Sequence, residues 1–205
     1  MNIFCIVLEK YNGKQSEIPS NYTKINCHLI FDVKMGENFR RKARMVPGGH
    51  VTDVPSSITY YSVVLRDSAQ ILFMIALLNY LKVLSCDIQN EYLTAPTWEK
   101  IWIIAGLEFG SEKGSIMMAV RALYGLKLSG KAFRSLLAET LYSLDYHPSY
   151  ADPDVWMRPA VKPDGYQYWE YVLCYVDDIL CISHYPEETM KGIQAKFKLK
   201  DDKVE

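Results

Sequence analysis

The sequence predicts a globular chain of mixed helices and strands, with the strands paired as antiparallel hairpins. Two strand-like apolar runs within residues 171–183 flank a central Asp-Asp pair, which predicts a hairpin with two carboxylates at its tip. Apolar and polar residues alternate over residues 24–33, and residues 39–46 return after a turn as a second hairpin. Between residues 130 and 146, apolar residues recur at three- and four-residue steps, as is typical of an amphipathic helix.

Composition limits the class of protein. The 205 residues are 49% hydrophobic and 23% charged, which indicates a folded chain with one core or two small subdomains that share one. The net charge of -1 argues against a generally basic nucleic-acid binder but allows a local basic patch. The five cysteines lack zinc-site spacing and are interpreted as core residues of an intracellular protein in a reducing compartment. The sequence contains neither a signal peptide nor an apolar segment long enough to span a bilayer.

Four further segments complete the expected elements. Residues 68–81 are predicted to form a helix, which should be buried because its apolar run covers nearly every face. Residues 82–88 form a short strand, and residues 158–167 a Pro/Gly loop that leads into the strand before the Asp-Asp turn. A last helix begins at Pro186.

Three carboxylates are the candidate chemistry. Asp87 ends the strand at residues 82–88 and points away from the face that carries its apolar residues, while Asp177 and Asp178 form the tip of the downstream hairpin. Three convergent carboxylates can hold two Mg²⁺ ions, which activate a hydroxyl nucleophile and stabilise a leaving pyrophosphate. The alternative is that Asp177 and Asp178 form an ordinary polar turn.

A basic run lies in the second strand of the first hairpin. Arg40, Arg41, Lys42 and Arg44 fall within five residues, and strand alternation places Lys42 and Arg44 on one face. The run is either a solvated face or a phosphate-binding surface.

The order of these motifs resembles the reverse transcriptase domain of copia-type LTR retrotransposons. YVDD alone would be a weak signal, but YVDD together with KAR, a DIQN-type strand end and ALYGLK, in that order, is highly specific. The matching segments are RRKARMV (residues 40–46), SCDIQNEYLTAP (85–96), RALYGLKLSGKAF (121–133), ADPDVW (151–156) and YVLCYVDDIL (171–180).

The resemblance implies an α+β, fingers-and-palm polymerase fold with an antiparallel palm sheet packed on helices and no thumb. Residues 1–205 would form a single reverse transcriptase domain, with a fingers hairpin at about residues 24–46 and a palm at about 67–197. The implied activity is RNA-directed DNA polymerisation from deoxynucleoside triphosphates on a primed RNA or DNA template, with Mg²⁺ or Mn²⁺ and without a membrane. RNase H and integrase would be partners from the same polyprotein.

The resemblance also implies roles for individual residues. Asp87 and Asp177 would bridge the metals, and Asp178 would support them. The nucleotide-binding residues would be Lys42 or Arg44 at the triphosphate, Tyr92 under the deoxyribose, and Tyr124, Gly125 and Lys127 along the pocket. From the sequence alone, the alternative interpretation of Tyr92 is a core aromatic residue.

Two positions depart from the family pattern. Glu91 stands where the family commonly has alanine, beside the expected sugar pocket, and Gly130 replaces a frequent proline. Because the family's thumb and RNase H regions are absent, we expect a truncated copy that polymerises poorly by itself. The alternative function is a catalytically inactive relict, or a fold co-opted to bind nucleic acid or protein. A Glu91 side chain turned outward to solvent would cost the site little.

Overall fold

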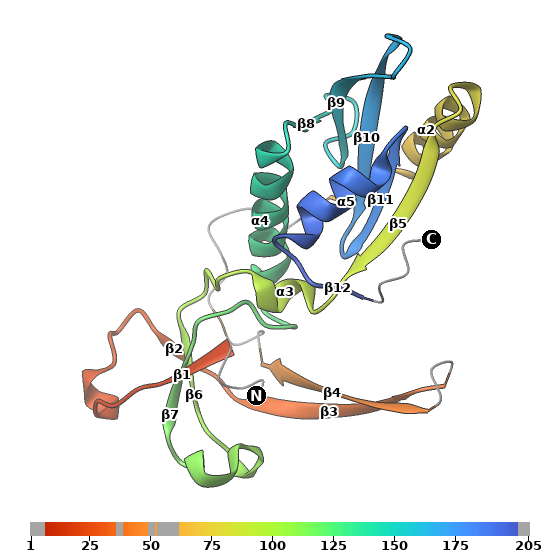
Figure 1. The fold of residues 1–205 in the computed structure, drawn as a ribbon. Helices are drawn as coiled ribbons and strands as arrows, with labels where there is room; N and C mark the ends of the chain where they lie inside the picture. The colour runs from red at the N-terminus through yellow and green to blue at the C-terminus, as the bar shows by residue number, and fades with distance from the viewer. Residues whose placement is uncertain (1–6, 36–38, 49–51, 53–61, 201–205) are drawn as a thin grey trace. The chain divides into compact units, whose positions relative to one another are not determined.

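The computed structural model describes residues 7–35, 39–48, 52 and 62–200, which form an α+β chain of two compact units (Figure 1). The first unit comprises residues 1–60 and 92–133, and the second comprises residues 61–91 and 134–205. Residues 92–133, which were expected within the palm, therefore group with the basic hairpin. The expected turn between the two hairpin strands lies partly outside the described residues.

The first unit contains a four-stranded sheet and a separate hairpin. The sheet has the order β1-β7-β6-β2 and packs on a core that includes Ile101, Ile103 and Phe109. Its elements are β1 (Leu8–Lys10), η1 (Gln15–Glu17), β2 (Thr23–Lys24), α3 (Glu91–Thr94), β6 (Ile101–Ile104), η3 (Leu107–Glu112) and β7 (Ile116–Ala119). Only α3 begins in the second unit, because the boundary falls after Glu91. The separate hairpin pairs β3 (Cys27–Lys34) with β4 (Arg40–Pro47), close to the expected limits.

The second unit is built on a six-stranded antiparallel sheet of order β12-β5-β11-β10-β9-β8. Its strands are β5 (Lys82–Ile88), β8 (His147–Pro148), β9 (Val155–Val161), β10 (Gln167–Tyr175), β11 (Asp178–Ser183) and β12 (Leu199–Lys200). The central strands β10 and β11 are mostly apolar, and Val172, Cys181 and Ile182 are completely buried. Strands buried on both faces read as continuous apolar runs, which is why residues 171–183 could be recognised.

Helices cover both faces of this sheet (Figure 1). On one face, α2 (Arg66–Leu78) packs Leu72 and Ala76 against Leu173 and Ile182. On the other face, α5 (Pro186–Gln194) lies over β5 and β11. The end of α4 (Ser129–Ser143), a helix that the two units share, contacts the same face, where the Tyr142 and Trp156 rings lie 5.1 Å apart. Within the described residues, no helix is both long and apolar enough to cross a membrane.

Two expectations about this unit are wrong. The helix at residues 66–78 is not buried all round, because only the stripe with Leu72 and Ala76 meets the sheet, and Leu77 is 72% exposed. Half of the expected loop at residues 158–167 is strand, and residues 162–166 form the turn between β9 and β10. Pro159 is tolerated in β9 because it lies beyond the end of the short neighbouring β8, where no partner strand needs its missing N–H.

Candidate functional site

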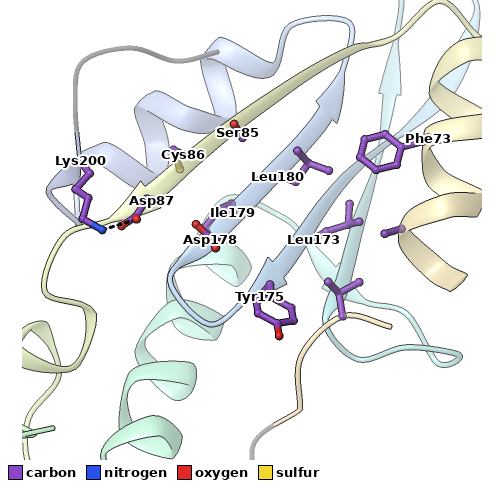
Figure 2. A pocket seen from close by; sticks show the side chains of 12 residues that line it. Phe73, Ser85, Cys86, Asp87, Leu173, Tyr175, Asp178, Ile179, Leu180 and Lys200 are labelled. Carbon is purple, nitrogen blue, oxygen red and sulfur yellow. Dashed lines mark hydrogen bonds and ion pairs between the residues drawn. The ribbon is translucent and has the colours of Figure 1, made fainter. Parts of the chain in front are cut away.

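The candidate site lies at one end of the six-stranded sheet, in the second unit. Asp178 begins β11 directly opposite Asp87 near the end of β5. Directly opposite residues of an antiparallel pair project from the same face, so the two carboxylates stand side by side, as Figure 2 shows. Asp177 lies next to Asp178 in the two-residue turn between β10 and β11. The structure thus gathers the three predicted aspartates at one end of the sheet; their roles stay a prediction.

The turn that carries the aspartates is strained. Val176 has a φ of +57°, a left-handed conformation that is an outlier for a β-branched residue. Two-residue hairpin turns with positive φ at this position favour glycine. The turn is held on both sides, because Tyr175 pairs with Asp178 and the Ile88 N–H donates a hydrogen bond of 2.8 Å to the Asp177 carbonyl. Such strain persists where the surrounding structure over-determines it, and it is common at functional sites.

The carboxylates repel one another. Burial, together with the nearby charges of Asp177 and Asp87, raises the pKa of Asp178, while the Lys200 ammonium opposes that rise. Burial and the charges of Asp87 and Asp178 likewise raise the pKa of the Cys86 thiol to about 12. The site therefore carries excess negative charge, which a bound cation would stabilise.

Lys200 supplies one cation. It pairs directly opposite Asp87 in the β12–β5 ladder, and its ammonium forms an ion pair with Asp87 Oδ2 (Figure 2). The other carboxylate oxygen, Asp87 Oδ1, is buried and has no hydrogen-bond partner among the residues that the structure describes. Buried polar atoms in folded proteins are nearly always paired, so this oxygen is suited to an additional ligand.

The aspartates border an open pocket of about 570 Å³ between the sheet and α2. One end is polar and the rest is apolar, as Figure 2 shows. The lining residues are Val64, Ala69, Phe73, Ser85, Cys86, Asp87, Leu173, Tyr175, Asp178, Ile179, Leu180 and Lys200.

The donor set fits a divalent metal only in part. In the part of the chain that the structure describes, no three His, Cys, Asp or Glu side chains are gathered closely enough to hold one ion. Mg²⁺, however, is usually bound through one or two carboxylates together with substrate phosphates and water. The unpartnered oxygen of Asp87 and the adjacent Asp178 carboxylate meet that requirement.

Glu91 does not turn outward to solvent. It opens α3 and is only 7% exposed. Burial lowers the pKa of Lys200, but the charges of Asp87, Asp177 and Glu91 raise it. Glu91 therefore lies within electrostatic range of the aspartate cluster. The structure thus favours the interpretation in which Glu91 adds a fourth carboxylate beside the site.

Four expected nucleotide-binding residues belong to the first unit. The Tyr92 and Tyr124 rings contact each other, with centroids 4.9 Å apart. Gly125 has a φ of +97°, and its Cα lies so close to the end of β4 that an added Cβ would be 3.1 Å from Val46 Cγ1. The Lys127 ammonium donates a hydrogen bond to the Thr52 carbonyl. Tyr92 and Tyr124 thus contact each other directly, and Gly125 and Lys127 follow Tyr124 along the chain.

The basic hairpin keeps the expected alternation. Lys42 pairs with Asp32 and Arg44 with Ile30, so the two cations share a face and are half-buried, whereas Ala43 is exposed on the other face. The hairpin belongs to the first unit and the aspartates belong to the second. The expectation that Lys42 or Arg44 faces the same cleft as the aspartates stays a prediction.

Sequence reasoning missed Lys200 and the pocket residues Tyr175 and Phe73. Lys200 reaches Asp87 only through strand pairing across 113 positions. No local pattern could have identified that pairing, because β12 has only two residues. Phe73 could have been found only if α2 had been recognised as a helix with one buried stripe.

The fold and the acidic hairpin agree with the outcome of comparison with known proteins. The family model described as reverse transcriptase (RNA-dependent DNA polymerase) matches residues 14–204, so the chain belongs to this family. The resemblance to copia-type retrotransposons is also confirmed. The chain is 24% identical over 192 residues to the retrovirus-related Pol polyprotein from transposon TNT 1-94 of Nicotiana tabacum, a match that covers 90% of this chain. It spans 14% of that polyprotein's length.

Proposed function

We propose that this reverse transcriptase domain transfers nucleotides from deoxynucleoside triphosphates to the 3′-hydroxyl of a primer on an RNA or DNA template. Asp87, Asp177 and Asp178 would hold two Mg²⁺ or Mn²⁺ ions. The single observation that carries this proposal is the direct pairing of Asp178 with Asp87, whose buried Oδ1 has no hydrogen-bond partner in the described part of the chain. Bound metals would supply activation of the primer hydroxyl and neutralisation of the leaving pyrophosphate.

The chain's own residues would position the substrates. The first unit would serve as the fingers, with Lys42 or Arg44 contacting the triphosphate. Tyr92 would lie under the deoxyribose and exclude a 2′-hydroxyl sterically. Tyr124, Gly125 and Lys127 would line the nucleotide side, and the six-stranded sheet would serve as the palm.

A second candidate is a domain that binds nucleic acid or protein without catalysis. It is favoured by the buried Glu91 carboxylate and by Lys200, which already engages Asp87. A fourth carboxylate would repel the triphosphate or draw a metal out of position.

Single-nucleotide incorporation on a DNA primer annealed to an RNA template separates the two candidates. The Asp177→Asn variant should lower the rate by about a thousandfold, because metal contacts stabilise the transition state by several kcal/mol. Asp164→Asn, in an exposed loop, is the matched control and should retain the wild-type rate. Glu91→Ala should increase the rate.

The opposite result is equally informative. If the wild type, Glu91→Ala and Asp177→Asn all fail to extend the primer but bind the hybrid with equal affinity, the binding function replaces the polymerase.

A further inference from the structure

Lys200 is held in a defined position beside the aspartates. It follows Phe197, which is only 1% exposed and fixes the chain after α5. The Gln89 N–H donates a 2.8 Å hydrogen bond to the Lys198 carbonyl, and Leu199 pairs with Ile88. The ladder then places Lys200 opposite Asp87, so its ammonium reaches the carboxylate as a fixed neighbour in the sheet.

The ammonium is surrounded by negative charge. It forms an ion pair with Asp87 Oδ2, and Asp87 in turn lies directly opposite Asp178 in the neighbouring strand. Asp177 adjoins Asp178 in the turn between β10 and β11. One lysine is thus the direct partner of a carboxylate that stands beside two others.

We propose that Lys200 is the resident counter-ion of the aspartate cluster, and that a divalent cation must displace its ammonium from Asp87 in order to bind there. Lys200 thereby sets the metal affinity of the site. This inference rests on the proposed two-metal function, because it assumes that Asp87 is a metal ligand.

The geometry explains why the two cations compete. Asp87 Oδ2 is engaged by Lys200, while Oδ1 is the atom without a partner. A metal on Oδ1 would place two positive charges within a few ångströms of the ammonium, and their repulsion in a partly buried site is substantial. Because the Lys200 side chain is 41% exposed, its flexible stem can move the ammonium into solvent.

The competing explanation is that Lys200 only ties β12 to β5. A structural tie would change the stability of the domain when it is removed, but not the intrinsic affinity of the carboxylates for metal.

A titration with Mn²⁺ distinguishes these explanations without any measurement of activity. Electron paramagnetic resonance of the free ion monitors how much Mn²⁺ is bound. Lys200→Gln removes the charge and should lower the Kd for Mn²⁺ by roughly three- to tenfold, as expected for loss of one partly exposed competing charge. Lys200→Met, which keeps the apolar stem, should lower the Kd for Mn²⁺ to the same extent as Lys200→Gln. Lys198→Gln removes the same charge from an exposed position nearby and should leave the Kd nearly unchanged. Lys200→Arg keeps the charge and should retain the wild-type Kd.

Two results would overturn the inference. One leaves the proposed metal site intact, and the other removes it. If Lys200→Gln and Lys200→Met bind Mn²⁺ with the wild-type Kd while Asp87→Asn loses binding, the metal site stands and Lys200 is only a structural tie. If Asp87→Asn binds Mn²⁺ as well as the wild type, the proposed metal site itself fails, and the inference falls with it.

Discussion

The six-stranded sheet carries one acidic centre on each face, and the two centres are organised in opposite ways. Glu170 in β10 lies on the face covered by α4 and α5, whereas Asp87 in β5 lies on the face toward α2. Both lie on strands with a neighbour on each side, and both pair with a cation, Arg158 for Glu170 and Lys200 for Asp87. They differ in how completely their oxygens are hydrogen-bonded.

Both oxygens of Glu170 are fully occupied. Its carboxylate is 4% exposed and accepts hydrogen bonds from one guanidinium and three hydroxyls. The donors are Arg158 Nε at 2.6 Å, Tyr168 Oη at 3.1 Å, Tyr146 Oη at 3.3 Å, and Ser183 Oγ. Arg158 in turn donates to the Leu144 carbonyl at 2.8 Å and stacks over the Tyr146 ring.

The difference separates a structural centre from a functional one. Burial would raise the pKa of Glu170, but hydrogen bonds from Ser183 and Arg158 outweigh it and lower the pKa overall. At the other centre, the pKa of Asp178 is raised and one oxygen of Asp87 has no partner. A carboxylate with every acceptor filled stabilises the fold, whereas an incompletely paired cluster keeps capacity for a ligand.

The largest expected effect on stability is at Glu170. Replacing it with glutamine should lower the free energy of unfolding by about 3 kcal/mol, because Arg158 would keep a partly buried charge without its partner. Urea denaturation monitored by circular dichroism measures this. Glu139→Gln, at an exposed position in the middle of α4, is the control and should change stability by less than about 0.5 kcal/mol. Equal stability of both variants would show that the Glu170 network is not structural.

The same comparison predicts a pH dependence. The pKa of Glu170 is lower in the folded than in the unfolded state, so its contribution is complete above the unfolded value of about 4.3 and is lost as pH falls through the folded value. The stability difference between wild type and Glu170→Gln should therefore be constant from about pH 7 to pH 5 and shrink below about pH 4. A difference that grows on acidification would contradict the assignment.

The smallest effect on stability is expected at Asp87. Asp87→Asn loses a partly exposed ion pair with Lys200 but also relieves repulsion with Asp178, so the free energy of unfolding should change by less than about 1 kcal/mol. The same variant should lose Mn²⁺ binding. A loss of about 3 kcal/mol, equal to that at Glu170, would make the Asp87 cluster a structural centre as well.

The sequence predicted the acidic hairpin and its flanking strands because apolar runs and turn residues are local signals. The aspartates could be assigned to strand ends for the same reason. The Glu170 network was not predicted, because Arg158 lies in the segment interpreted as a loop. The other partners of Glu170 come from β10, β11 and the segment between α4 and β8, which are brought together only by the fold. Lys200 was missed since a two-residue strand has no periodicity. The burial of Glu91 and the exposure of Leu77 depend on tertiary packing that one sequence does not encode locally.

The central claim is that Asp87, Asp177 and Asp178 bind the metals of a polymerase. Its most direct test is anomalous diffraction from crystals of the chain with Mn²⁺, a primed template and a deoxynucleoside triphosphate. Two Mn²⁺ peaks are expected, about 3.5–4 Å apart and roughly 2.0–2.2 Å from carboxylate oxygens that include Asp87 Oδ1, with the Lys200 ammonium moved away. Mn²⁺ held by the triphosphate alone, with Asp87 still bound to Lys200, would contradict the claim.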